Sequence, residues 1–172
     1  SVAPFEKYGE VVLYSNTVAA QAPERVKDAD IIVVNKTPMN EATLSGASNV
    51  RLICEFATGF DNIDLDYCRS RGITVVNVRN YSTAVVAQHT FAMALYLLEK
   101  LRYYDDYVKK GVYASQSSFS HFGMTFGELD GKTWGIVGMG NIGRKVASIA
   151  QAFGCRVIFY SASGKSTCTD YE

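Results

Sequence analysis

A glycine-rich turn between an apolar strand and a helix is the feature that most constrains this chain of 172 residues. The hexapeptide Gly-Met-Gly-Asn-Ile-Gly at 138–143 directly follows an apolar run at 133–137. A helical pattern at 142–153 and a second apolar run at 156–160 come next, so the order is strand, turn, helix, strand. This order is typical of a parallel β-α-β unit that binds a dinucleotide.

Each glycine of the turn has its own expected role. Gly138 permits the tight turn, Gly140 lets a pyrophosphate approach the backbone, and Gly143 lets the helix pack closely on the strand. The backbone N–H groups of Asn141 and Ile142 would then face a diphosphate at the positive end of the helix. We therefore predict a nucleotide site here. The alternative is a glycine-rich turn that binds no nucleotide.

The residues after the run at 156–160 should distinguish NAD from NADP. In the NAD pattern an acidic side chain at this point accepts the ribose 2′-hydroxyl, but Ser161 follows the strand here. Ser161, Ser163 and Lys165 offer two hydroxyls and one cation, which would suit a 2′-phosphate. A neutral loop that discriminates poorly is the alternative, so the expected cofactor is NAD or NADP.

The first half of the chain shows the same alternation of short apolar runs and helical segments. The expected strands are 11–14, 31–34, 50–56 and 73–78, and the expected helices are 21–29, 41–45 and 65–71. Such alternation is typical of right-handed crossovers and a parallel sheet. The predicted fold class is therefore α/β, with doubly wound parallel sheets.

A long helix is expected at 83–110, and Gly111 should end it. Either Ser82 or Thr83 would supply the N-cap oxygen. The stretch 114–127 lacks periodicity but is rich in rings and apolar groups. These side chains are Phe119, His121, Phe122, Met124 and Phe126. Because an apolar loop is unfavourable in water, we expect it to pack on a neighbouring domain or a second subunit.

Composition limits the classes of partner. Seventeen Lys and Arg residues balance seventeen Asp and Glu residues, so the chain has no broad charge for nucleic acid or an anionic membrane. No stretch approaches the roughly 18 apolar residues of a membrane span, and the first residues do not resemble a signal peptide. The four cysteines lack the spacing of metal ligands, which predicts no metal site and a reducing, cytoplasmic location.

Four segments along the chain form a joint pattern that is more specific than the glycine turn alone. They are Asn35-Lys36-Thr37-Pro38, Ala57-Thr58-Gly59-Phe60-Asp61-Asn62-Ile63-Asp64, Ser82-Thr83-Ala84-Val85-Val86-Ala87-Gln88-His89-Thr90 and Leu129-Asp130-Gly131-Lys132-Thr133. With the turn, they resemble the D-isomer-specific 2-hydroxyacid dehydrogenases, and most nearly the glycerate dehydrogenase (hydroxypyruvate reductase) branch. The resemblance covers nearly the whole chain.

The resemblance implies a domain organisation and an activity. It implies a partial flavodoxin-like substrate domain at 1–79 and a partial NAD(P)-binding Rossmann domain at 80–172, which includes a long interdomain and dimerisation helix. The implied reaction is hydride transfer between a nicotinamide cofactor and a small 2-keto or 2-hydroxy acid, of the hydroxypyruvate, glyoxylate or D-glycerate type. The implied assembly is a homodimer.

The same resemblance implies roles for residues outside the glycine turn. The backbone N–H groups of Thr58 and Gly59 would bind the substrate carboxylate beside the nicotinamide ribose, where a side chain on the glycine would block the approach. Val86 would pack against the nicotinamide, and Lys36 could reach the substrate pocket. The structural alternatives are a plain turn, a core valine and a solvated lysine.

By resemblance, the catalytic Arg, Glu and His of the family belong to segments that would follow residue 172. We therefore expect no catalytic residue in this chain, structural roles for His89 and His121, truncation at both ends, and an inactive fragment. A non-catalytic NAD(H)-sensing, corepressor-like protein and an autonomous scaffold module on the same fold are the alternatives.

Overall fold

The computed structural model describes residues 3–161, 164 and 168–171 of the chain. The chain divides into two compact units, Ser1–Arg79 and Asn80–Glu172.

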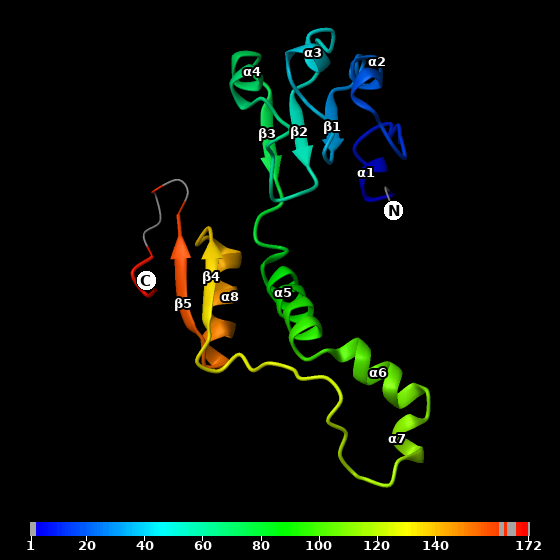
Figure 1. The fold of residues 1–172 in the computed structure, drawn as a ribbon. Coiled ribbons are helices and arrows are strands. Elements are labelled where there is room, and N and C mark those ends of the chain that lie inside the picture. The colour runs from blue at the N-terminus through cyan, green and yellow to red at the C-terminus, as the bar shows by residue number, and fades with distance from the viewer. Residues whose placement is uncertain (1–2, 162–163, 165–167, 172) are drawn as a thin grey trace. The chain divides into compact units, whose positions relative to one another are not determined.

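The first unit contains a parallel sheet. Its strands within the described residues are β1 (Ile31–Val34), β2 (Leu52–Glu55) and β3 (Thr74–Asn77), in the order β1-β2-β3 (Figure 1). The register places Val34 beside Glu55 and Glu55 beside Asn77, so the three strands end level with one another. The expectation of a parallel α/β fold is confirmed. Runs rich in Ile and Val favour strands because the branched side chains pack well on a pleated surface.

Short helices precede and connect these strands. Before β1 lie α1 (Ala3–Glu6), the 3-10 helix η1 (Ala19–Gln21) and α2 (Ala22–Val26). Helix α3 (Glu41–Leu44) connects β1 to β2, and α4 (Leu65–Ser70) connects β2 to β3. The side chain of Asn40 caps α3 by accepting from the N–H of Thr43 at 3.2 Å, and Asp64 caps α4 by accepting from Tyr67 at 2.9 Å. The buried core of the unit is formed by Val26, Ile32, Val34, Met39, Leu44, Ala47, Val50, Ile53, Ile63, Cys68 and Ile73.

The expectation of a strand at 11–14 is wrong. The described structure has no strand there, and Val12 and Leu13 are exposed. A strand needs a neighbour for its backbone hydrogen bonds, and β1 pairs only with β2 within the described residues. An apolar run alone is therefore not sufficient to predict a strand.

The second unit is built around the β-α-β segment that follows the glycine turn. Strand β4 (Thr133–Val137) pairs in parallel with β5 (Arg156–Tyr160), and helix α8 (Asn141–Ala152) connects them (Figure 1). Helix α5 (Thr83–Leu98) packs on α8. The core of this unit consists of Ala87, Phe91, Met139, Val146, Ala147, Ala150, Cys155 and Val157. Phe91 anchors α5, because its ring stacks on Trp134 with a centroid separation of 4.6 Å.

The single long helix expected at 83–110 is two helices. Helix α5 ends at Leu98, and α6 (Leu101–Lys109) begins after Lys100, which has a left-handed φ of 55°. The carbonyl of Lys100 accepts from the N–H of Tyr103 at 2.9 Å and so starts the new helix. The two segments differ in patterning: α5 is apolar on most sides, whereas α6 alternates charged and aromatic faces.

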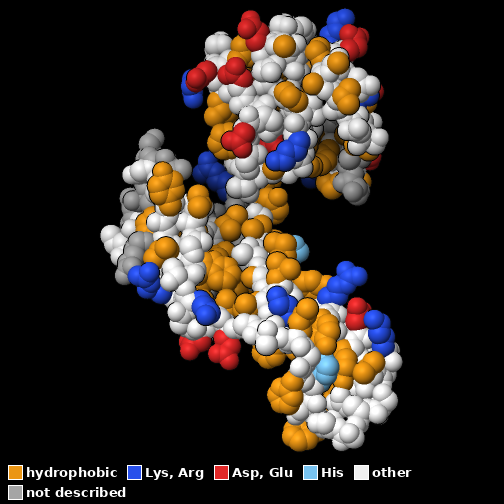
Figure 2. Space-filling model, viewed as in Figure 1, with side chains coloured by type: hydrophobic (Ala, Val, Ile, Leu, Met, Phe, Trp, Pro, Cys, Tyr) orange, Lys and Arg blue, Asp and Glu red, His pale blue; other side chains and the backbone are white. Residues whose placement is uncertain are grey.

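An aromatic arm follows α5; it comprises α6, the short helix α7 (Val112–Ser115) and the irregular stretch to Gly127. The ring of His121 stacks on Tyr107 at 3.8 Å, and its Nε2 lies 2.8 Å from the hydroxyl of Tyr103. In contrast, Phe119 and Phe122 are 90% and 96% exposed. Hydrophobic side chains are visible on the surface of this arm (Figure 2). His121 is thus packed against tyrosine rings of the same arm.

Candidate functional site

The glycine turn connects β4 to α8 and is bonded to the end of β5. Gly138 has a positive φ of 92°, a backbone conformation that is strained for residues with a side chain. Its N–H donates to the carbonyl oxygen of Tyr160 at 2.8 Å, so the turn is tied to the last residue of β5. The tight turn expected at Gly138 is therefore present, beside the point where Ser161 leaves the sheet.

The other two glycines of the turn differ in what surrounds them. Gly143 is buried, and a Cβ there would clash with the carbonyl oxygen of Gly138. Gly140, at the N-cap of α8, is exposed, and a Cβ there would meet no heavy atom of the described residues within 4 Å. Gly143 therefore serves packing within the protein, whereas the space beside Gly140 is open to a ligand.

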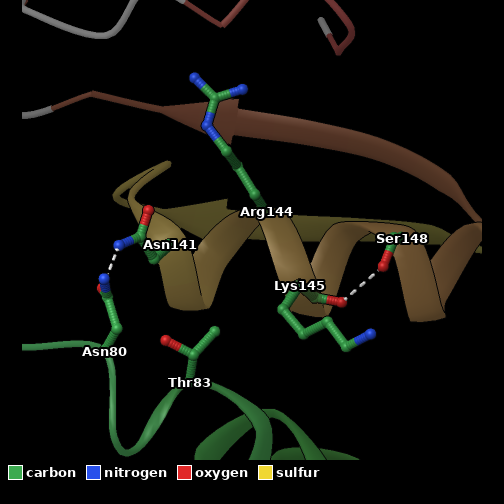
Figure 3. A pocket seen from close by; sticks show the side chains of 6 residues that line it. All are labelled: Asn80, Thr83, Asn141, Arg144, Lys145 and Ser148. Carbon is green, nitrogen blue, oxygen red and sulfur yellow. Dashed lines mark hydrogen bonds between the residues drawn. The ribbon is translucent and has the colours of Figure 1, made fainter.

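A shallow groove of about 550 Å³ lies beside the start of α8. Its lining residues are Asn80, Thr83, Asn141, Arg144, Lys145 and Ser148 (Figure 3). The amide of Asn141 donates to the side-chain oxygen of Asn80 at 2.6 Å. Asn80 has a left-handed φ of 61°, a conformation that Asn tolerates better than most residues. The sequence interpretation missed Asn80; its place just before the N-cap of α5 was the available signal.

The remaining residues predicted to bind the cofactor differ in their exposure to solvent. Ser161 is half-buried directly after β5, whereas Ser163 and Lys165 lie outside the described residues. Val86, on the first turns of α5, is 39% exposed. Ile142 is half-buried and Asn141 is exposed at the start of α8.

The loop that carries Thr58 and Gly59 is fixed to the end of β3. The amide of Asn77 donates to the carbonyl oxygen of Thr58 at 2.7 Å, and the Thr58 hydroxyl donates to the carbonyl of Val78 at 2.9 Å. Both Thr58 and Gly59 are exposed. A Cβ on Gly59 would make only an ordinary contact of 3.5 Å with Asp61, so the protein's own packing does not require this glycine.

Lys36 lies in the neighbouring loop, after β1. It is exposed and has a left-handed φ of 69°. The amide of Asn62 donates to the carbonyl oxygen of Thr37 at 3.0 Å, so this loop is bonded to the loop that follows β2. The carboxyl ends of adjacent parallel strands are where α/β proteins bind ligands. The structure brings Lys36, Thr58 and Gly59 to that edge of the sheet.

Glu55, which the sequence interpretation did not single out, is buried under these loops. Its side chain is 1% exposed, and its Oε2 accepts from the amide of Asn62 at 3.0 Å. The period of two along β2 places Glu55 on the same face as the buried Ile53. That spacing was a signal for a carboxyl group in the core.

The free cysteines are buried or half-buried, whereas His89 is exposed. Burial raises the pKa of the thiols of Cys54, Cys68 and Cys155, with a further contribution from Asp64 at Cys68 and from Asp130 at Cys155. A raised thiol pKa disfavours the nucleophilic thiolate. His89 is exposed on α5, so the structural role expected for it is not supported by burial.

The part of the chain that the structure describes contains neither a metal-binding cluster nor a membrane-spanning helix. No group of three or more His, Cys, Asp or Glu side chains there is arranged to hold a metal ion. In the same ranges, no helix is both long and apolar enough to cross a membrane.

Parallel sheets, with a glycine turn at a helix N-terminus, define a Rossmann-type α/β protein. The chain belongs to the D-isomer-specific 2-hydroxyacid dehydrogenase family, since the model of that family's catalytic domain matches residues 1–169. The resemblance seen in the sequence is confirmed.

Named relatives agree with this family. The chain is 34% identical over 160 residues to a hydroxypyruvate reductase of Blautia hydrogenotrophica, an alignment that covers 91% of this chain and 50% of the relative. It is 32% identical over 149 residues to a glycerate dehydrogenase of Methylorubrum extorquens, covering 87% and 48%. The chain thus spans about half the length of the curated relatives it matches.

Solved structures agree as well. A D-lactate dehydrogenase from Aquifex aeolicus, complexed with NAD and lactic acid, superposes with a TM-score of 0.79 and 35% identity over 98% of this chain and 49% of its own. An acyclic imino acid reductase in complex with NADPH and D-Arg superposes with a TM-score of 0.82 and 28% identity. The superposition covers 99% of this chain and 54% of the reductase.

Proposed function

We propose that the full-length protein that carries this chain is a nicotinamide-dependent oxidoreductase that interconverts a small 2-keto acid and its 2-hydroxy acid. The observation that carries this proposal is the geometry of the glycine turn, in a chain of this family: Gly138 turns the backbone, and Gly140 leaves open space at the start of α8. In this proposal, 1–79 is part of the substrate domain and 80–172 is part of the nucleotide domain.

The residues at the turn fit a dinucleotide. The space beside Gly140 would admit the pyrophosphate, which the N–H groups of Asn141 and Ile142 would face at the positive end of α8. Gly138 and Gly143 would keep the turn and helix in this position. The exposed side chain of Val86 would contact the nicotinamide. When bound, the nicotinamide would supply or accept the hydride.

Two loops of the first unit would bind the substrate. The N–H groups of Thr58 and Gly59 would bind its carboxylate, on a loop that Asn77 and Val78 hold to β3. Lys36 would add a positive charge from the loop after β1. Charge-assisted hydrogen bonds of this kind are stronger than neutral ones, and therefore suit recognition of a small carboxylate.

The substrate class and the cofactor are proposed more finely from the relatives. Named relatives include hydroxypyruvate reductase, glycerate dehydrogenase and glyoxylate reductase, so we propose hydroxypyruvate, glyoxylate or D-glycerate as the substrate. The cofactor is NAD or NADP. Ser161, with Ser163 and Lys165, would favour a 2′-phosphate, because no acidic side chain occupies the position after β5.

The proposed assembly is a homodimer in the cytoplasm. The aromatic arm exposes Phe119, Phe122, Met124 and Phe126, and an exposed apolar surface of this kind favours burial against a second subunit.

An assay of the full-length protein tests the function. Purified protein is mixed with hydroxypyruvate, glyoxylate or pyruvate, each with NADH and with NADPH, and oxidation of the cofactor is followed at 340 nm. We expect turnover with at least one pair. Absence of turnover with every pair contradicts the proposal, and nucleotide binding without turnover favours the non-catalytic alternative. A strong preference for NADH contradicts a phosphate site at Ser161.

A further inference from the structure

Glu55 is an unusual side chain for its position. It ends strand β2 on the face that Ile53 buries, and it is itself only 1% exposed. Ionisable side chains are rarely buried to this extent unless they have a specific partner. The partner here is the amide of Asn62, which donates to Oε2 of Glu55 at 3.0 Å.

The second carboxyl oxygen of Glu55 makes the side chain a poor contributor to stability. Oε1 is buried and has no hydrogen-bond partner among the described residues. A buried oxygen without a partner costs free energy on folding. An apolar side chain of similar size would avoid this cost. Its presence is therefore better explained by what its other oxygen holds.

Asn62 connects the loops after β1 and β2. Both hydrogens of its amide are used, one by the carbonyl of Thr37 at 3.0 Å and one by Glu55 at 3.0 Å. Its backbone carbonyl accepts from the N–H of Met39 at 2.8 Å. A parallel bridge between Met39 and Ile63 continues the connection. Asn62 thus bonds the loop of Lys36 to the loop of Thr58 and Gly59.

We propose that Glu55 is a positioning residue that, by holding the amide of Asn62, fixes the loop at 35–38 relative to the loop at 57–61. This inference rests on the proposed function, in which both loops bind the substrate carboxylate. Glu55 does not touch the substrate; it acts through Asn62. The spacing between the proposed donors of the two loops then depends on a carboxyl group below them.

The physical reason lies in the two hydrogens of one amide. If Glu55 offered no acceptor, one N–H of the half-buried Asn62 would lose its partner. The amide could recover that loss only by rotating, which would weaken its bond to Thr37. The loop of Lys36 would then lose one of its links to the loop of Thr58, and the arrangement that favours the bound carboxylate would be less populated.

Three variants of the full-length protein test the inference. Glu55→Met removes the acceptor but keeps the side chain apolar and of similar length. Glu55→Gln keeps one acceptor oxygen for Asn62. Ile53→Ala is the matched control, because Ile53 is fully buried on the same face of β2 but makes no polar contact with Asn62 among the described residues. KM, kcat, cofactor affinity and Tm are measured for each.

We expect KM for the keto acid to rise about tenfold in Glu55→Met, the effect of losing one hydrogen bond of ordinary strength. Its kcat and NAD(P)H affinity should change less than about twofold. Its Tm should change little, because removal of the unpartnered Oε1 offsets the bond that Asn62 loses. Glu55→Gln should restore most of the KM. Ile53→Ala should lower Tm and leave KM unchanged. An unchanged KM in Glu55→Met, or a rise that Ile53→Ala matches, overturns the inference.

Hydrogen exchange separates this inference from the proposed function. If the wild-type protein has no turnover, the proposed function fails, and amide exchange of the peptides covering 35–39 and 57–63 decides the role of Glu55. Faster exchange of both peptides in Glu55→Met, with unchanged exchange in 133–160, supports the positioning role. Unchanged exchange in 35–39 and 57–63 overturns it.

Discussion

A side chain on Gly143 cannot coexist with the present position of Gly138. A Cβ on Gly143 would overlap the carbonyl oxygen of Gly138 and would also approach Ile136 at 3.4 Å. Gly138 in turn holds the left-handed conformation that bends the chain between β4 and α8. The first and last glycines of the turn are therefore coupled: the close packing of the helix depends on the shape of the turn.

Gly143→Ala should destabilise the protein and disrupt the proposed nucleotide site together. We expect a loss of about 1–3 kcal/mol in the free energy of unfolding, the usual cost of overpacking a dense core. The Kd for NAD(P)H should rise more than tenfold, because α8 must move away from the turn proposed to face the pyrophosphate. Urea unfolding and fluorescence titration measure the two quantities. Wild-type stability in this variant would contradict the packing role.

Gly140→Ala should separate nucleotide binding from stability. A Cβ here would meet no heavy atom of the described residues within 4 Å, and the φ of −83° is accessible to alanine. We expect the free energy of unfolding to change by less than about 0.5 kcal/mol, as for other surface substitutions. The Kd for NAD(P)H should nevertheless rise at least tenfold, because the methyl group takes the space proposed for the pyrophosphate. Unaltered affinity in the same titration would place the nucleotide elsewhere.

Apolar runs in the sequence predict strands best where the next strand along the chain is also the pairing partner in the sheet. The runs at 133–137 and 156–160 coincide with β4 and β5, because each is a β-branched or aromatic run beside the other in the sheet. The run at 11–14 has a similar apolar character but no strand partner in the described structure, so it stays irregular. Pairing is a tertiary property that a single apolar run does not contain.

The sequence predicts the glycines of the candidate site, but it does not predict the hydrogen bonds that hold the loops of the site together. Gly138 and Gly143 stand out because their spacing has a known geometric reason. Glu55 and Asn62 were missed because their bond joins a strand to a loop seven residues later, and no short motif encodes it. The helix break at Lys100 was not predicted, because lysine is common inside helices. Unlike Gly or Pro, it does not indicate a break, even though its backbone here has a positive φ.

Gly123→Ala should disturb the aromatic arm and weaken self-association. A Cβ on Gly123 would clash with the hydroxyl of Tyr103 and with Nε2 of His121, which lie 2.8 Å apart. The substitution must therefore separate these two groups and shift the loop that carries Phe122. We expect the proposed dimer to dissociate at about tenfold higher protein concentration, as measured by analytical ultracentrifugation, with NAD(P)H affinity unchanged. Ser117→Ala, on the same arm but outside this contact, is the control.

Stability should fall in alkaline solution through the buried thiols. Burial raises the pKa of Cys68 and Cys155 above the ordinary thiol value, so the folded protein retains these protons when the unfolded chain has lost them. The thiols make no difference to stability while both states are protonated, below about pH 8. As the pH rises above about 8.5, the unfolded state is stabilised by ionisation and the free energy of unfolding decreases.

The measurement is the urea midpoint between pH 7 and pH 10.5, compared between the wild type and the double variant Cys68→Ala, Cys155→Ala. The variant loses some packing at every pH, because both side chains are buried. Its midpoint should nevertheless fall less steeply than that of the wild type above about pH 8.5. Tyrosines and lysines also titrate in this range, but they are common to both proteins and cancel in the comparison. Parallel pH profiles would show that the thiols ionise equally in the folded and unfolded states, contrary to their burial in the two cores.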